Sequence, residues 1–244
     1  MTDNTVPQGT LKEKIRLLLA AHKGYTLAAA AAVILAAVLL IAALTAKETL
    51  LTGILLDYHR DAPEEAYYAL NQGFAEEKGL DPRLWEVRLA KNLAYSGNNI
   101  DPTFHDNFTA IDKLSDYISG GMLDFLLAEA ETLESLAYSG FFTDLREILT
   151  SQQLESWAPY IRYMDMAVID RLEQMALSKE YPEDFALPDP GKPEEMEAPV
   201  PVFIDVTGIP GTEQIWPGSK VYYAVALNTQ HPTIVKDYAE YLLG

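Results

Sequence analysis

Two polar strings that each follow an apolar run hold the residues best suited to chemistry. Their members combine a phenol, an imidazole, a guanidinium and two carboxylates: Tyr58, His59, Arg60, Glu129 and Glu131. In an open parallel sheet, ligands meet the loops at the carboxyl ends of the strands. If the two apolar runs are strands, these residues are candidates for a ligand-binding cleft, and the alternative is a set of solvated loop residues with no ligand.

Catalytic chemistry has little support in these patterns. The string His59-Arg60-Asp61 occurs in kinase catalytic loops, but the chain has neither a Gly-rich phosphate loop nor Asp-Phe-Gly. Glu131 and Glu134 could act as a glycosidase-like carboxylate pair, yet they stand three residues apart in an acid-rich segment, where such pairs arise by chance. No nucleophile, base and orienting group occur together, so we expect no catalytic residue and no enzyme.

Metal and cofactor sites are not expected either. The chain has no cysteine, which excludes thiolate nucleophiles, Cys-ligated zinc and iron–sulfur clusters. Its four histidines show no zinc-binding spacing, and its acidic strings do not follow the calcium-loop pattern. Among the three tryptophans, Trp216 stands between Ile215 and Pro217 in a turn-rich stretch, and we expect it at the ligand site.

The charge is distributed unevenly along the 244 residues. The chain has 18 Lys and Arg against 36 Asp and Glu, a formal net charge of -18. Residues 1–46 contain four basic residues and only Asp3 and Glu13 as acids, so this segment is basic and residues 47–244 are strongly acidic. A nucleic-acid partner is not expected, because phosphate contacts need a basic surface.

Residues 24–46 carry no charge and are nearly all Ala, Leu, Ile or Val. A helix of that length spans about 35 Å, enough to cross a hydrocarbon core of about 30 Å. All the basic residues of the N-terminal part precede the span. The positive-inside rule therefore predicts a signal-anchor helix with residues 1–23 in the cytoplasm and residues 47–244 outside. The basic, amphipathic residues 11–21 suit the inner membrane surface.

Two alternatives to this anchor remain. A cleaved signal peptide usually has an apolar region of about 7–15 residues that ends in a small-x-small site. Here the run is longer, and cleavage after Ala46 would place Leu44 where a small residue is preferred. A buried helix of a soluble protein is the other alternative, although such helices seldom lack a polar face over this length.

The external part begins with alternating strands and helices. Strands are expected over residues 50–57, 84–90 and 122–128, and helices over 62–78, 102–118 and 129–138, with a loop over 92–101. This order is typical of a parallel sheet with helices on both faces. The predicted fold class is therefore α/β, a single doubly wound lobe preceded by the membrane helix.

Beyond residue 141 the pattern changes. Short helices are expected over residues 143–149 and 151–160, the second with Ser151 as its N-cap. Residues 161–177 are apolar but ambiguous between helix and strand. Residues 181–201 contain six prolines and six acids, which predicts a solvated loop. Strands over 202–206 and 221–227 and a helix over 231–243 complete the chain.

Residues 111–149 carry Gly121-x-x-Asp124 before an expected strand, and then Gly140, Phe142, Asp144 and Leu145 after an expected helix. This pattern resembles the bacterial extracellular solute-binding proteins of ABC transporters, of the type II periplasmic-binding-protein class. Residues 222–243 resemble the family's strand and following helix that pack the lobe. The resemblance covers residues 50–244. It implies that the loops holding Tyr58 and Glu129 face a ligand, with aromatic rings stacking on sugars or peptides.

The sequence also departs from this family. Members usually have two lobes and are about twice as long as the external part here, and they are anchored by a lipidated cysteine. A single lobe provides only half of the cleft that closes on a ligand. We therefore expect a non-catalytic, membrane-anchored module in the cell membrane that binds a sugar, peptide or amino acid, or docks on ABC permease subunits or another membrane protein. The alternative is a structural or assembly protein of the cell envelope that has lost ligand binding.

Overall fold

The computed structural model describes residues 12, 23–45, 47–59, 61–91, 104–178 and 187–244. The chain divides into two compact units, Met1–Ala46 and Lys47–Gly244. The first contains helix α2, Lys23–Thr45, whose described side chains, residues 27–41, are all exposed. Among the described residues, no helix is both long and apolar enough to cross a membrane. The membrane span expected over residues 24–46 stays a prediction.

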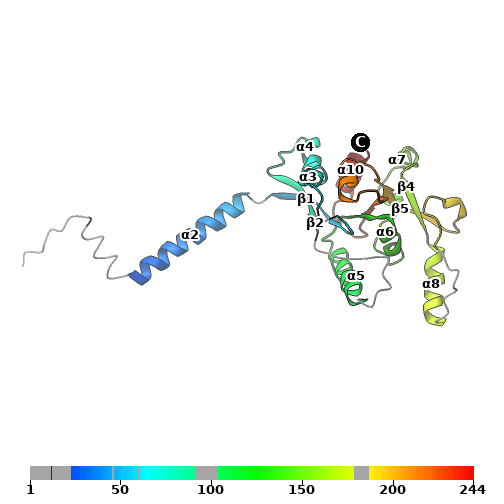
Figure 1. The fold of residues 1–244 in the computed structure, drawn as a ribbon, viewed down its shortest axis with the longest axis horizontal. Coiled ribbons are helices and arrows are strands. Elements are labelled where there is room, and N and C mark those ends of the chain that lie inside the picture. The colour runs from blue at the N-terminus through cyan, green and yellow to red at the C-terminus, as the bar shows by residue number, and fades with distance from the viewer. Residues whose placement is uncertain (1–11, 13–22, 46, 60, 92–103, 179–186) are drawn as a thin grey trace, which may run out of the picture. The chain divides into compact units, whose positions relative to one another are not determined.

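The second unit is built on one six-stranded mixed sheet in the order β2-β1-β3-β6-β5-β4 (Figure 1). The strands are β1 (Glu48–Leu55), β2 (Trp85–Ala90), β3 (Phe125–Glu129), β4 (Ile161–Asp165), β5 (Pro199–Asp205) and β6 (Val221–Val225). Strands β2, β1 and β3 are parallel, whereas each of the pairs β3–β6, β6–β5 and β5–β4 is antiparallel. The predicted parallel sheet is therefore correct for the two pairings among β2, β1 and β3 and wrong for the three pairings that involve β6, β5 and β4.

The connection lengths explain part of this difference. Helices α3 (Glu64–Asn71) and α4 (Gly73–Glu77) return the chain from β1 to β2, and α5 (Phe104–Ser119) lies between β2 and β3. Crossovers of this kind produce parallel neighbours. Between β5 and β6 the only helix is α9, Thr212–Ile215, which is about 6 Å long and shorter than either strand. The chain therefore turns back, and β6 pairs antiparallel with β5.

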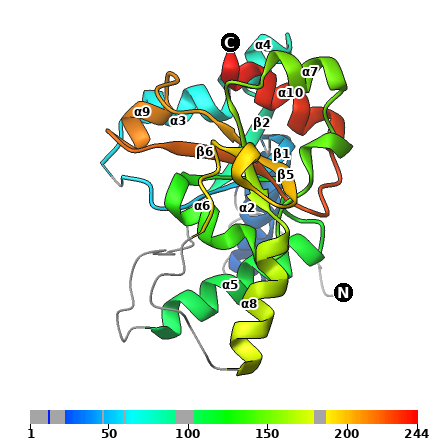
Figure 2. The same ribbon diagram turned by 90° about the vertical axis from the view of Figure 1, so that its right-hand side faces the viewer.

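Helices cover both faces of the sheet, as expected for a doubly wound domain. Figure 2 shows α3, α4 and α10 (Pro232–Leu243) on one side, and α5 and α6 (Ala130–Ala137) on the other. Strand β3 illustrates the result, because its side chains alternate between two hydrophobic clusters. Phe125 and Leu127 pack with the first group of helices, and Leu126 and Ala128 pack with the second. Burial on both faces is why this segment is an uninterrupted apolar run.

The helix expected over residues 62–78 is divided into α3 and α4 at Gln72. Two tyrosines of α10 account for the break. The Tyr241 hydroxyl donates a hydrogen bond of 2.6 Å to the Ala69 carbonyl, and the Tyr238 hydroxyl donates one of 2.6 Å to the Leu70 carbonyl. Carbonyls at the end of a helix need partners from outside it, and these hydroxyls supply them. The partners are about 170 residues away, so the local pattern could not reveal the break.

Several later elements differ from the expectation in detail. Residues 143–149 form only the short turn η1, Leu145–Glu147. Helix α7, Ser151–Ser156, is capped by Thr150 and not by Ser151, because Thr150 and Gln153 form a reciprocal capping box. The ambiguous segment 161–177 contains both β4 and α8, Ala167–Ser178. In the proline-rich stretch 181–201 there is a turn, η2 (Pro193–Glu195), and β5 begins at Pro199. The loop expected over 92–101 lies outside the described residues.

Candidate functional site

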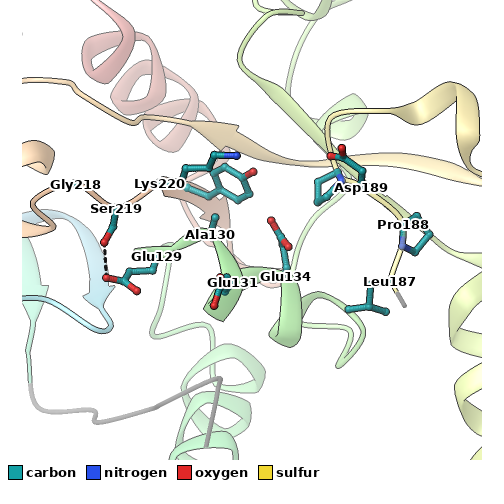
Figure 3. Close-up of a pocket in the computed structure, with 12 residues that line it drawn as sticks. Glu129, Ala130, Glu131, Glu134, Leu187, Pro188, Asp189, Gly218, Ser219 and Lys220 are labelled. Carbon is teal, nitrogen blue, oxygen red and sulfur yellow. Dashed lines mark hydrogen bonds between the residues drawn. The ribbon is translucent and has the colours of Figure 1, made fainter. Parts of the chain in front are cut away.

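An open cavity of about 620 Å³ lies beside the carboxyl end of β3 and the amino end of β6. It is lined by residues 129–131 and 134, by the loop 187–190, and by residues 218–220 and 222. Strands β3 and β6 bring the first and last of these segments together, because Glu129 pairs with Val221 in their antiparallel register. Figure 3 shows the Glu134 carboxylate pointing between Lys220 and Asp189, with Leu187 and Pro188 on the side of Asp189.

The first turn of α6 forms one wall of the cavity. Strand β3 ends at Glu129, and the Ala130 amide donates a hydrogen bond of 2.9 Å to the Lys220 carbonyl. The Ser219 hydroxyl donates one of 2.8 Å to Oε1 of Glu129. These two bonds hold the end of β3 against the segment before β6. They fix the position from which Glu129 and Glu131 reach the cavity.

Charge in the cavity is predominantly negative. The lining includes four carboxylates, from Glu129, Glu131, Glu134 and Asp189, and one ammonium group, from Lys220. Burial raises the pKa of Glu134, and the negative charge of Glu131 adds to this increase, while a hydrogen bond from Tyr222 acts against it. Burial has a cost for a carboxylate only when it is ionised, so this raised pKa marks a charge that lacks full compensation.

A fixed network supports Tyr222 behind the cavity. Burial, followed by the charges of Glu134 and Asp205, raises the pKa of Tyr222 to about 12. Its ring is stacked on Phe203 with ring centroids 5.5 Å apart. Arg162 donates a hydrogen bond of 2.7 Å to Asp205, which pairs with Tyr222 across β5 and β6. The phenol is therefore neutral at physiological pH and held in one orientation beside Glu134.

Asp57 joins the end of β1 to α6 beside this site. Its backbone has a φ of 51°, in the left-handed region that few residues other than glycine adopt. Its Oδ2 accepts a hydrogen bond from the Thr132 hydroxyl. Burial raises the pKa of Asp57, the Thr132 bond opposes the increase, and the charge of Glu129 adds to it. The residue sets the path of the loop that follows β1.

The structure brings together only part of the predicted site. Glu129 and Glu131 line the cavity, whereas Tyr58 and His59 are not among the lining residues. The Tyr58 hydroxyl donates to the Lys91 carbonyl at 2.8 Å, and the His59 amide donates to the Ile215 carbonyl at 2.8 Å. The His59 side chain is exposed, and Arg60 lies outside the described residues.

Trp216 belongs to the core and does not line the cavity. Its side chain is only 1% exposed. The indole Nε1 donates a hydrogen bond of 2.9 Å to the Leu56 carbonyl, just after β1. A ring buried in this way has no free face on which a ligand could stack. Ile215, the residue before Trp216, is buried as well. Two large apolar residues in succession were the sequence feature that could have indicated a core position for Trp216.

The remaining lining residues were not singled out as ligand-binding. The sequence pattern presents Glu134 only as one member of a chance carboxylate pair and places Asp189 in a solvated loop. Lys220 and Tyr222 reach the carboxyl edge because β6 runs antiparallel, and a sheet assumed to be parallel places them at the opposite edge. No group of three or more His, Asp or Glu residues in the described part of the chain is arranged to hold a metal ion.

Comparison with known proteins finds no matching family model, no matching curated protein and no matching solved structure. The function is therefore argued from the fold and the cavity.

Proposed function

We propose that this chain is a non-catalytic solute-binding module anchored in the cell membrane, with residues 47–244 outside the cytoplasm. The cavity at the carboxyl edge of the sheet is the observation that carries the proposal. Its volume of about 620 Å³ falls in the range of small-molecule sites, about 300–1,000 Å³. It combines polar groups with an apolar wall formed by Leu187 and two prolines, as such sites do.

The topology supports binding at this edge. Strand β1 lies between β2 and β3, so the chain leaves β1 on one side for β2 and later returns on its other side as β3. The two crossovers place α3 and α5 on opposite faces of the sheet (Figure 2). Ligands of open α/β sheets bind outside the carboxyl ends of the strands, and the cavity lies at that end of β3, on the side of β6.

The proposed family is a shortened, single-lobed relative of the type II solute-binding proteins. Its support is the resemblance of residues 111–149 and 222–243, together with a three-layer α/β unit built on a mixed sheet. One lobe offers one wall of a cleft, so a membrane partner such as an ABC permease would complete the site. A lobe that has lost its ligand and serves envelope assembly is the alternative, and solute titration separates the two.

Solute binding is tested by thermal unfolding of the full chain in detergent. A ligand that binds only the folded state raises the Tm. At a concentration 100 times its Kd it adds about 2.7 kcal/mol to the free energy of unfolding. We expect at least one class among sugars, peptides, amino acids, dicarboxylates and diamines to do so. Ser219→Trp should remove the shift by filling the cavity, and Ser156→Trp, on an exposed position of α7, should leave it intact. No shift with any class would contradict solute binding and leave docking on a membrane partner or the assembly role.

Membrane placement has a separate test, which uses the absence of cysteine. The support for an anchor is the uncharged stretch 24–46 and the basic residues before it. We expect a membrane-impermeant maleimide to label Ser156→Cys in intact cells, and to label Thr5→Cys only after the membrane is opened. Labelling of both positions, or of neither, in intact cells would contradict the proposed orientation.

A further inference from the structure

We propose that the cavity binds an organic cation that carries two or more ammonium groups on an aliphatic chain, a diamine or a polyamine. This inference rests on the proposed function, because it names the ligand class of the same cavity. It depends on three properties of the site, namely the position of one partly buried carboxylate, the charge of the lining, and the size and apolar part of the cavity.

The position of Glu134 is the first argument. Its carboxylate points into the cavity (Figure 3) and accepts a hydrogen bond from Tyr222. Tyr222 in turn lies beside the ion pair of Arg162 and Asp205, whose charged atoms are 2.7 Å apart. The cavity therefore contains one carboxylate, that of Glu134, which is held in position and partly shielded from water. An ammonium ligand would compensate the cost of burying that charge, whereas a neutral or anionic ligand would increase it.

The charge of the lining is the second argument. Two separate segments contribute carboxylates, namely the end of β3 with the first two turns of α6, and the loop 187–190; Lys220 is the one basic residue of the lining. The formal sum over these lining residues is three negative charges. A ligand with several ammonium groups spaced along a chain can approach more than one of these carboxylates, whereas a monocation can approach only one at a time.

Size and apolar surface are the third argument. A cavity of about 620 Å³ is far larger than a single hydrated ion needs. Leu187, Pro188 and Pro190 form an apolar wall beside the carboxylates. Methylene groups between two ammonium groups would bury against this wall, which removes their apolar surface from water. Apolar and anionic surfaces side by side thus match an aliphatic diamine.

The test uses four-carbon probes that differ only in their ends. 1,4-diaminobutane, butylamine, 1,4-butanediol and succinate are titrated calorimetrically into the full chain in detergent at physiological salt. We expect the diamine to bind best, butylamine more weakly, and the diol and succinate not at all. Glu134→Gln should weaken diamine binding by about 10- to 100-fold, since it removes a hydrogen bond between charged groups.

A matched control addresses non-specific attraction to this acidic chain. Glu240→Gln removes the same charge from an exposed position of α10, on the opposite face of the sheet. We expect it to leave the diamine affinity unchanged. An equal loss in Glu240→Gln and Glu134→Gln would show that the diamine responds to the net charge alone, and the inference would then be wrong.

The pH profile gives a second readout. A diamine binds the ionised form of Glu134, whose pKa in the free protein is raised by burial and by Glu131 and Asp189, and lowered by Tyr222 and Lys220. Affinity should therefore fall as the pH drops from neutrality through that raised pKa, and this fall should begin above the ordinary value of 4.5. Glu134→Gln should abolish that part of the profile.

The outcomes separate this inference from the proposed function. Binding of a sugar, peptide, diol or succinate without binding of the diamine would overturn the inference and leave the solute-binding proposal intact. Displacement of the diamine by calcium at a much lower concentration would also overturn it, in favour of an inorganic cation. If no solute of any class bound, both this inference and the solute-binding proposal would be contradicted.

Discussion

Trp216→Ala is expected to lower the free energy of unfolding by about 3–5 kcal/mol, the range for removal of a buried tryptophan. The side chain is 1% exposed and packs in the cluster between the sheet and α3, α9 and α10. Its Nε1 also bonds the carbonyl of Leu56, so the variant creates a cavity and leaves that carbonyl without this partner. Urea unfolding of the full chain in detergent, followed by circular dichroism, measures the change.

Trp216→Phe separates the two contributions. Phenylalanine retains much of the apolar volume but cannot donate to Leu56, so we expect a smaller loss of about 1–3 kcal/mol. Both variants should keep their diamine affinity under conditions where they are folded, because the ring does not line the cavity. If Trp216→Phe had wild-type stability and bound no solute, the ring would be a ligand platform, as its neighbourhood in the sequence first indicated.

The parallel half of the fold could be predicted because its signals are local. Residues 50–57 and 122–128 are apolar runs, and they correspond to β1 and β3, which are buried on both faces. The helix expected over 129–138 is α6 within one residue at each end. Periodicity and end signals of this kind depend on neighbouring residues, which a single sequence displays directly.

The antiparallel half could not be predicted in the same way. Strand direction depends on how the chain returns, and residues 161–177 contain a strand and a helix without a turn signal between them. The consequence for the site is direct. Glu129 and Glu131 stand at the carboxyl end of a parallel strand and line the cavity at that edge, whereas Lys220 and Tyr222 reach the same edge at the start of an antiparallel strand, whose direction the sequence does not indicate.

The motif residues that carry the family resemblance have structural roles here. Asp144 caps η1, with its side chain accepting a hydrogen bond from the Arg146 amide. Leu145 is buried in the core, and Phe142 forms a bridge with Ala226 beyond β6. Gly140 has a φ of 72°, which ends the turn after α6 without strain. These roles stabilise the lobe whether or not it binds a solute.

Asp124, another residue of that motif, has the other large expected effect. It is 3% exposed at the start of β3. Its Oδ2 accepts from the Thr52 amide at 2.8 Å, and its Oδ1 accepts from the Thr229 hydroxyl at 2.7 Å and lies 3.0 Å from Nδ1 of His231. One carboxylate thereby ties β1 and β3 to the loop before α10.

Asp124→Asn is expected to cost about 2–4 kcal/mol of unfolding free energy, although it changes the shape of the side chain little. An amide has one acceptor oxygen in place of two, so a donor would remain opposite the amide nitrogen, and an unsatisfied buried donor costs about 1–3 kcal/mol by itself. Amide hydrogen exchange should accelerate at Thr52 or in the loop before α10, because the single acceptor oxygen of the amide can serve only one of these two sides.

Asp237→Asn is the matched control for Asp124→Asn. Asp237 pairs with Lys78 at 3.1 Å, but its side chain is 31% exposed, and a solvated ion pair contributes about 0–1 kcal/mol. The same chemical change should therefore have a small effect at the surface and a large one at Asp124. If the two variants unfolded at the same urea concentration, the buried carboxylate would not be what holds the α10 loop to β1, and the packing of Tyr238 and its neighbours would have to account for that contact alone.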